Sequence, residues 1–334
     1  MAGLGTVVPL AAQGPGPAPL PDAELLRRLA QSADSLAAID EFSGVVLLVR
    51  NGVPLFQRAY GLADRESRRP NDPETAFNLG SINKVFTATA IRQLAAAGRI
   101  DLDSTLATYW PAYPNRDVAR RVTVRQLLQH RSGVGGDIFA APAGGKRNDL
   151  RHNRDFLPLF VGEPLQFEPG TKSQYSNAGY VVLGLLVERL SGEDYYEYVR
   201  RHIYEPAGMS RTGHYAVDSL PSNTAIGYTR RSDEAAPSSP VRRNTALLPG
   251  RGSSAGGGYS TAADLARFLQ ALRAGKITAG PASGIGVAGG APGLNAVLEG
   301  DLPGGLDLIV LANLDPPAAE RIAELVRSWL GVKD

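Results

Sequence analysis

Residues 77–94 read FNLGSINKVFTATAIRQL, in which Ser81 stands at the predicted start of a helix and Lys84 follows three residues later. At this spacing both side chains lie on one helical face, within hydrogen-bonding reach of each other. A serine hydroxyl at neutral pH is a poor nucleophile unless a neighbour accepts its proton. A lysine can accept that proton only where burial or another cation lowers its pKa from about 10.4. Apolar neighbours such as Ile82 and Phe86 predict that this helix is buried.

Taken alone, this spacing has an ordinary structural explanation, because serine commonly begins helices and most lysines are solvated charges. A second segment, residues 167–192, favours a catalytic interpretation. It reads FEPGTKSQYSNAGYVVLGLLVERLSG and places Tyr175 and Asn177 just before a strongly apolar helix. A phenol beside Ser81 and Lys84 can act as a phenolate general base, and the Asn177 amide can orient the lysine or bind a substrate amide. The structural alternative is a core tyrosine followed by a helix cap.

Predicted strands gather at the two ends of the chain, and the segments between them are mainly helical. The predicted strands are residues 44–50, 53–61, 294–299 and 306–313. The predicted helices are residues 21–37, 81–97, 123–130, 177–190, 194–204, 261–272 and 317–330. Asn51-Gly52 is a hairpin turn signal, and Thr261 and Asp264 are spaced as a capping box. This pattern predicts an α+β (mixed α/β) fold, in which both chain ends build an antiparallel sheet flanked by helices.

A mainly helical domain is inserted between the sheet-forming ends, and the active site is expected at their junction. We predict a single catalytic domain over residues 22–330, with an α/β part at about 22–75 and 255–334 and a helical part at about 76–254. Residues 1–21 hold a short apolar stretch before a Pro/Gly-rich run, without a preceding Lys or Arg. They are predicted to be a flexible leader or the remnant of an export signal. A signal favours a periplasmic or secreted protein, and a plain leader leaves a cytoplasmic location open.

Composition excludes several classes of function. The formal net charge of +2 is spread without a basic block, so neither nucleic acid nor a membrane surface is predicted as a partner. The chain has no cysteine, and no apolar run reaches the length of a transmembrane segment. The four histidines lack metal-binding spacing and no nucleotide-binding glycine motif is present, so neither a metal nor a cofactor is predicted. Among the histidines, His130 is expected to form a hydrogen bond within the framework.

Residues 252–256 read GSSAG and match the G-x-S-x-G motif, which makes Ser254 a rival nucleophile. In α/β-hydrolases this motif follows a buried strand, and a histidine comes later in the chain. Residues 242–249 are not a convincing buried strand, and no histidine follows Ser254. We therefore predict a glycine-rich loop here and not a catalytic turn.

Several segments together resemble the class C-like branch of the serine β-lactamase and penicillin-binding-protein superfamily, over roughly residues 40–330. Residues 81–84 (SINK) resemble its S-x-x-K motif, and residues 175–177 (YSN) resemble its Y-x-N motif. Framework stretches that resemble the same branch are residues 122–134, 205–209 and 255–269. Several such stretches in one order are far more specific than any single motif.

The resemblance implies a serine hydrolase that works through an acyl-enzyme on a small-molecule ester or amide. By the same resemblance, Ser81 is the nucleophile, Lys84 and Tyr175 relay its proton, and Asn177 lines the site. The resemblance leaves the oligomeric state open. That branch of the superfamily includes carboxylesterases as well as D-amino-acid peptidases, so the resemblance alone does not name the substrate.

The family's third motif, K-T-G or H-x-G, is altered here to Val287-Ala288-Gly289, without a basic residue or a hydroxyl. Gly289 and Gly290 are small enough for this strand to approach a substrate, and the Gly290 N–H can pair with the Ser81 N–H as an oxyanion hole. The missing cation removes the natural partner of a substrate carboxylate, which β-lactams and peptidoglycan termini carry. We therefore favour an esterase on small neutral acyl substrates. The alternatives are a β-lactamase, a D-alanyl-D-alanine carboxypeptidase or D-aminopeptidase, and a non-catalytic binding protein with a degenerate third motif.

Overall fold

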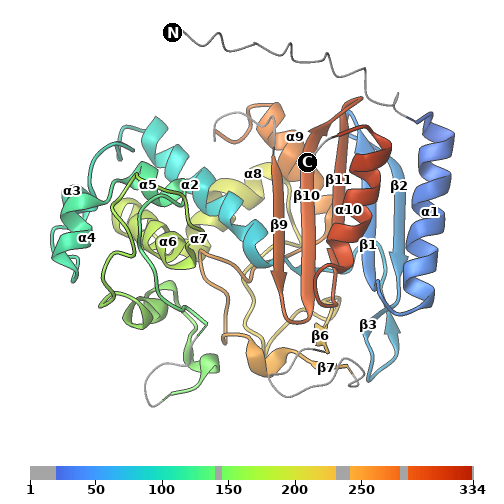
Figure 1. The fold of residues 1–334 in the computed structure, drawn as a ribbon, viewed down its shortest axis with the longest axis horizontal. Helices are drawn as coiled ribbons and strands as arrows, with labels where there is room; N and C mark the ends of the chain where they lie inside the picture. Colours follow the sequence, from blue (N-terminus) through green and yellow to red (C-terminus); the bar gives the residue numbers. More distant parts are fainter. Residues whose placement is uncertain (1–19, 140–144, 231–240, 279–284, 333–334) are drawn as a thin grey trace, which may run out of the picture.

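The computed structural model describes residues 20–139, 145–230, 241–278 and 285–332, so the predicted leader lies almost wholly outside the described residues. At its centre is a five-stranded antiparallel sheet with the strand order β2-β1-β11-β10-β9 (Figure 1). The strands are β1 (Gly44–Arg50), β2 (Val53–Tyr60), β9 (Gly286–Ala291), β10 (Leu294–Leu302) and β11 (Leu306–Ala312). Because β1 and β2 belong to one chain end and β9 to β11 to the other, the predicted sheet built from both ends is confirmed.

Helices cover both faces of this sheet, which explains why β1 is buried along nearly its whole length. Successive residues of a strand point to opposite faces. Val46 therefore packs in one core with residues of α1 (Asp22–Ala38) and α10 (Ala318–Trp329). Its neighbour Val45 packs in a second, larger core that includes α9 (Ala262–Arg273). The sheet thus lies between helical layers, and its edge strand β9 contacts the helical region (Figure 1).

The helical region is organised around α6 (Asn177–Ser191), in which every residue from Ala178 to Val187 is buried. A helix that is apolar on all sides packs inside a domain and not on its surface. It packs against α2 (Lys84–Ala96), and a short 3₁₀ turn (Gly80–Asn83) leads into α2. The segments that carry the first two motifs therefore lie at the starts of two packed helices.

The other elements are short. The remaining helices are α3 (Leu106–Tyr109), α4 (Arg116–Arg121), α5 (Val124–Leu128), α7 (Tyr195–Val199) and α8 (Glu205–Ala207), with 3₁₀ turns at Arg147–Asp149, Asn153–Leu159 and Thr245–Leu247. The remaining strands pair two by two: β3 (Leu62–Asp64) with β4 (Arg69–Pro70), β5 (Phe77–Asn78) with β8 (Tyr259–Ser260), and β6 (Tyr228–Thr229) with β7 (Arg242–Arg243). Residues 194–204, predicted as one helix, divide into α7 and a π-helical turn. None of the described helices has the length and apolar character needed to cross a membrane.

The capping box predicted for α9 is only half formed. The Asp264 N–H donates to Thr261 Oγ1 (3.1 Å), as the spacing predicts. The Asp264 carboxylate, however, accepts hydrogen bonds from the Arg211 N–H and from Thr212 Oγ1, both at 2.8 Å. These two partners lie far away in the sequence, and the other carboxylate oxygen pairs with Arg267 one helical turn later. This buried carboxylate therefore joins α9 to a distant segment and does not close the cap.

Candidate active site

Ser81 is positioned by backbone pairing on both sides of a tight turn. The Leu79 N–H donates to Gly258 O (2.8 Å), and the Gly257 N–H donates to Gly80 O (3.3 Å). Gly80 adopts a φ of +50°, a conformation that favours glycine, and the chain then enters the 3₁₀ turn that carries Ser81. The glycine-rich loop before β8 therefore supports the candidate nucleophile through main-chain contacts.

The amino group of Lys84 is buried beside Ser81, and only 6% of the residue is exposed. Its Nζ donates to Ser81 Oγ (3.1 Å), to Asn177 Oδ1 (2.8 Å) and to the backbone oxygen of Ala255. None of these partners is a carboxylate, and burial lowers the pKa of Lys84 to about 7. At neutral pH a substantial fraction of this amine is uncharged and can accept a proton.

Tyr175 completes the group around Ser81. Its Oη lies 2.5 Å from Ser81 Oγ, in a hydrogen bond that either hydroxyl can donate. Lys84 Nζ lies 4.8 Å from the centre of the Tyr175 ring. Although more than half of Tyr175 is exposed, partial burial raises its pKa, and the hydrogen bond with Ser81 opposes this shift. The side chain is therefore a neutral phenol at pH 7, which favours a proton donor over the phenolate base that the sequence allowed. The structure thus brings the predicted residues Ser81, Lys84, Tyr175 and Asn177 into one hydrogen-bonded group.

His130 packs against Tyr175, a contact that the sequence did not reveal. Its ring stacks near the rings of Tyr175 and Tyr180, with centroids 4.7 and 5.0 Å away. Its Nδ1 accepts the Ser176 N–H (3.1 Å), so the expected framework hydrogen bond of His130 is confirmed. Burial, assisted by the nearby charge of Lys84, lowers the pKa of His130 to about 4, and the imidazole is neutral at pH 7. No local motif marks this stacking, because it joins segments that are far apart in the chain.

The altered third motif lies on the edge strand β9, directly against the backbone beside Ser81. A Cβ atom added to Gly289 would lie 2.1 Å from Leu79 O and 2.8 Å from Ser81 N, so only glycine permits this approach. Gly290 lines a pocket at Ser81, and Val287 lines a groove on the other side. The predicted residues Gly289 and Gly290 are therefore next to Ser81, where backbone groups can contact a substrate carbonyl.

Asn295 is fully buried and joins β9 to the start of α10. Its Nδ2 donates to Gly289 O (3.1 Å), and its Oδ1 accepts the Ala319 N–H (2.7 Å). We expect Asn295→Ala to lower the free energy of unfolding by about 2 kcal/mol, because it leaves these buried backbone groups without partners. Urea denaturation measures the loss. As a control, Asn115→Ala removes the cap of α4 and is expected to cost about 1 kcal/mol or less; equal losses would contradict the role of Asn295.

Two other kinds of site are not supported by the described residues. Ser254, the serine of the G-x-S-x-G match, is fully buried, with its Oγ 2.7 Å from Asn153 Oδ1 and 2.8 Å from Tyr180 O. A substrate carbonyl cannot reach this oxygen, and residues 252–256 form a loop, as predicted. Within the described ranges, no three His, Asp or Glu side chains gather where they could hold a metal ion.

Two cavities meet at Ser81. An open groove of about 490 Å³ extends from Ser81 between α2 and the start of β9. A smaller pocket of about 60 Å³ lies on the other side. Its apolar lining includes Ile138, Phe139, Phe156, Leu248 and Leu294. Lys84 and Tyr175 both line the groove and do not line the apolar pocket, so the groups that can move protons face one side of Ser81.

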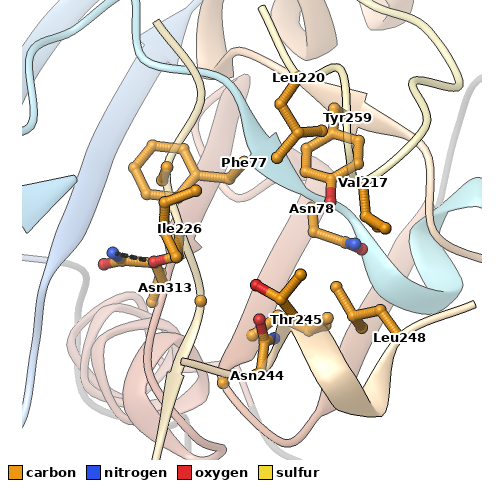
Figure 2. A pocket seen from close by; sticks show the side chains of 15 residues that line it. Phe77, Asn78, Val217, Leu220, Ile226, Asn244, Thr245, Leu248, Tyr259 and Asn313 are labelled. Atoms are coloured by element: carbon orange, nitrogen blue, oxygen red, sulfur yellow. Dashed lines mark hydrogen bonds between the residues drawn. The ribbon is translucent and has the colours of Figure 1, made fainter. Parts of the chain in front are cut away.

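A third, smaller cavity of about 20 Å³ adjoins the apolar pocket. The two cavities share Asn78, Val217, Leu248, Tyr259 and Leu294 in their linings. Figure 2 shows the first four of these side chains around the small cavity. Its volume holds about one water molecule. The small cavity therefore adds little room to the apolar pocket beside it.

The sequence model of the beta-lactamase family matches residues 30–323 of the chain. Putative penicillin-binding protein PbpX of Bacillus subtilis (strain 168) is 32% identical over 236 residues, which are 71% of this chain and 56% of that protein. The chain spans about half the length of the curated relatives it matches. A penicillin-binding protein from Bacillus halodurans has a TM-score of 0.77 at 28% identity, covering 91% of this chain and 99% of that one. EstCE1, a hydrolase with promiscuous acyltransferase activity, shares the fold, with a TM-score of 0.72 at 21% identity over 93% of this chain and 99% of that one.

Proposed function

The chain belongs to the beta-lactamase family of serine hydrolases, and on this premise we propose that it is an esterase that transfers small neutral acyl groups to water through Ser81. The main support for this proposal is that, among the described residues, no cationic side chain lines the groove at the altered third motif. Val287 and Ala288 line it there, and neither side chain can pair with a carboxylate close to the scissile bond. β-Lactams and peptidoglycan termini present such a carboxylate, whereas simple esters do not.

In the proposed acylation step, the neutral amine of Lys84 accepts the hydroxyl proton of Ser81 across their 3.1 Å contact. The Ser81 oxygen then forms a bond to the ester carbonyl carbon. The carbonyl oxygen becomes negatively charged, and the backbone N–H groups of Ser81 and Gly290 stabilise it. When the bond to the leaving alcohol breaks, Tyr175 gives its proton to that alcohol and regains the proton that Lys84 holds. The result is an acylated Ser81, a free alcohol and a neutral Lys84.

Water completes the proposed cycle by the reverse sequence of proton transfers. It occupies the place of the departed alcohol, next to Tyr175 and Lys84, and gives up one proton as it attacks the acyl carbon. The bond to Ser81 breaks, Ser81 regains a proton, and the carboxylic acid leaves. Asn177 Oδ1 accepts a hydrogen bond from Lys84 throughout, which holds the amine within reach of Ser81.

The positions of the proton-handling groups give the substrate a direction in the site. The leaving oxygen must lie beside Tyr175, which lines the open groove, so the alcohol part of the ester occupies the groove. The acyl part then lies in the apolar pocket on the other side of Ser81. Because that pocket is small and the cavity beside it adds room for about one water molecule, short unbranched acyl groups fit it best.

A direct comparison of substrates tests this proposal. We expect kcat/KM for p-nitrophenyl butyrate to exceed that for nitrocefin by about a hundredfold or more, because the carboxylate of nitrocefin finds no cation at the third motif. Steady-state rates of the wild-type protein with both chromogenic substrates provide the measurement. A nitrocefin value that rivals the ester value would refute the preference for neutral substrates, and cleavage of a D-alanyl-D-alanine peptide in place of esters would favour the carboxypeptidase alternative.

A further inference from the structure

The groove on the alcohol side of Ser81 has a cation at its far end. One stripe of α2 lines the groove, including Lys84, Ala88 and Arg92, which are spaced by four residues and so lie on one helical face. Eight residues separate Lys84 from Arg92, which is about 12 Å along a helix. The groove therefore joins the candidate nucleophile to a guanidinium group roughly two helical turns away.

Arg92 has no counter-ion within the part of the chain that the structure describes. It is exposed, and its guanidinium makes no hydrogen bond or ion pair there. Other arginines of this chain are paired with carboxylates, as Arg125 is with Asp103 and Arg273 is with Asp307. None of the described residues that line the groove is an Asp or Glu, and residues 279–284, which precede β9, contain neither residue in the sequence.

The wall between Ser81 and Arg92 is aromatic. Tyr175, His130 and Tyr180 line the groove and stack in that order along it. Burial raises the pKa of Tyr180 to about 12, and the charge of Arg92 opposes this shift, so Arg92 lies close enough to act on the Tyr180 ring. A flat, apolar group followed by a negative charge would thus contact the aromatic wall first and Arg92 beyond it.

We propose that Arg92 is an anion-binding subsite, and that preferred substrates are esters whose alcohol part carries a carboxylate about 10 Å from the scissile bond. This inference rests on the proposed esterase function and specifies the alcohol, whereas the acyl group stays small and neutral. The guanidinium can bind a carboxylate through two parallel hydrogen bonds, a geometry that suits arginine better than lysine. The position of the charge distinguishes these substrates from β-lactams, whose carboxylate would lie beside Val287.

Two matched esters test the subsite. One is the butyrate ester of 3-(4-hydroxyphenyl)propanoic acid, which carries a carboxylate at the far end of its alcohol part. The other is the butyrate ester of 3-(4-hydroxyphenyl)propanamide, in which a neutral amide replaces that carboxylate and the scissile ester is unchanged. We expect the wild-type protein to prefer the carboxylate ester by about tenfold in kcat/KM, and Arg92→Gln to lose this preference. Arg120→Gln removes an exposed arginine of α4 outside the groove, and this variant is expected to retain the preference for the carboxylate ester. The preference of the wild-type protein should also shrink in high salt.

The ratio of the two kcat/KM values decides the outcome. The subsite would be overturned if kcat/KM for the carboxylate ester divided by that for the neutral ester were equal in the wild-type protein and Arg92→Gln. A value of this ratio near one in the wild-type protein would overturn it as well. If neither ester is hydrolysed, the esterase proposal fails, and the subsite is tested by binding alone. For that purpose 3-(4-hydroxyphenyl)propanoate is titrated into each protein and followed by NMR. Weaker binding to Arg92→Gln by about tenfold would support the subsite, and unchanged binding would refute it.

Discussion

Replacing Ser81 with alanine is expected to lower kcat for p-nitrophenyl butyrate by about a thousandfold or more. The reason is that the acyl-enzyme cannot form without the Ser81 oxygen, although Lys84 and Tyr175 would remain in place. Ser81 Oγ is the hydroxyl that contacts both proton-handling groups, through a hydrogen bond from Lys84 Nζ and one with Tyr175 Oη. Wild-type and variant proteins are assayed in parallel, and circular dichroism establishes that both are folded.

Ser254→Ala is the matched control for this experiment, because it removes the serine of the rival motif. We expect it to keep ester hydrolysis within a few-fold of wild type, at some cost in stability, since the Ser254 hydroxyl contacts the buried Asn153. Loss of activity in a folded Ser254→Ala with retention in Ser81→Ala would reverse the assignment of the nucleophile. If the wild-type protein hydrolyses no ester, no nitrocefin and no D-alanyl-D-alanine peptide, the altered third motif has disabled the site, and the non-catalytic binding protein becomes the better explanation.

The parts of the fold that could be predicted are those whose signals are local. The hairpin of β1 and β2 follows from an apolar run, an Asn-Gly turn and a returning strand, and α6 follows from its continuous apolar sequence. Residues 194–204 were predicted as one helix because a 3.6-residue period does not reveal where an α-helix widens into a π-helical turn. The partners of Asp264 were missed because Arg211 and Thr212 reach it only through tertiary packing.

The candidate site shows the same division between local and distant contacts. Ser81 and Lys84 were predicted to meet because three residues of a helical turn separate them, and the structure places them 3.1 Å apart. The Ala255 backbone oxygen, which accepts a hydrogen bond from Lys84, could not be predicted, because no side chain identifies a main-chain acceptor. The packing of His130 on Tyr175 and the position of Arg92 along the groove could not be predicted for a related reason, because only the folded chain places these residues there.

The activity is expected to follow the ionisation of Lys84. Since burial lowers the pKa of Lys84 to about 7, its ammonium form dominates below that pH and cannot accept the proton of Ser81. We therefore expect kcat/KM for p-nitrophenyl butyrate to rise about tenfold per pH unit below pH 7 and to level off above it. A further decline at high pH is expected only for esters of aliphatic alcohols, which need the proton of Tyr175 to leave, whereas p-nitrophenolate leaves without one; burial raises the pKa of this phenol above its usual value.

This profile separates Lys84 from the other base near Ser81. His130 has a pKa of about 4, so a reaction that depended on its neutral ring would already be near its maximum at pH 5 to 6. Lys84→Arg keeps a positive charge that does not titrate in this range, and Lys84→Ala removes the base; we expect each to lower kcat by about a thousandfold. An inflection near 7 that persists unchanged in a still active Lys84→Ala would show that another group accepts the proton of Ser81. The inflection and its loss in both variants together identify the buried amine as the base, because no other group contacting Ser81 Oγ has its pKa lowered towards neutrality.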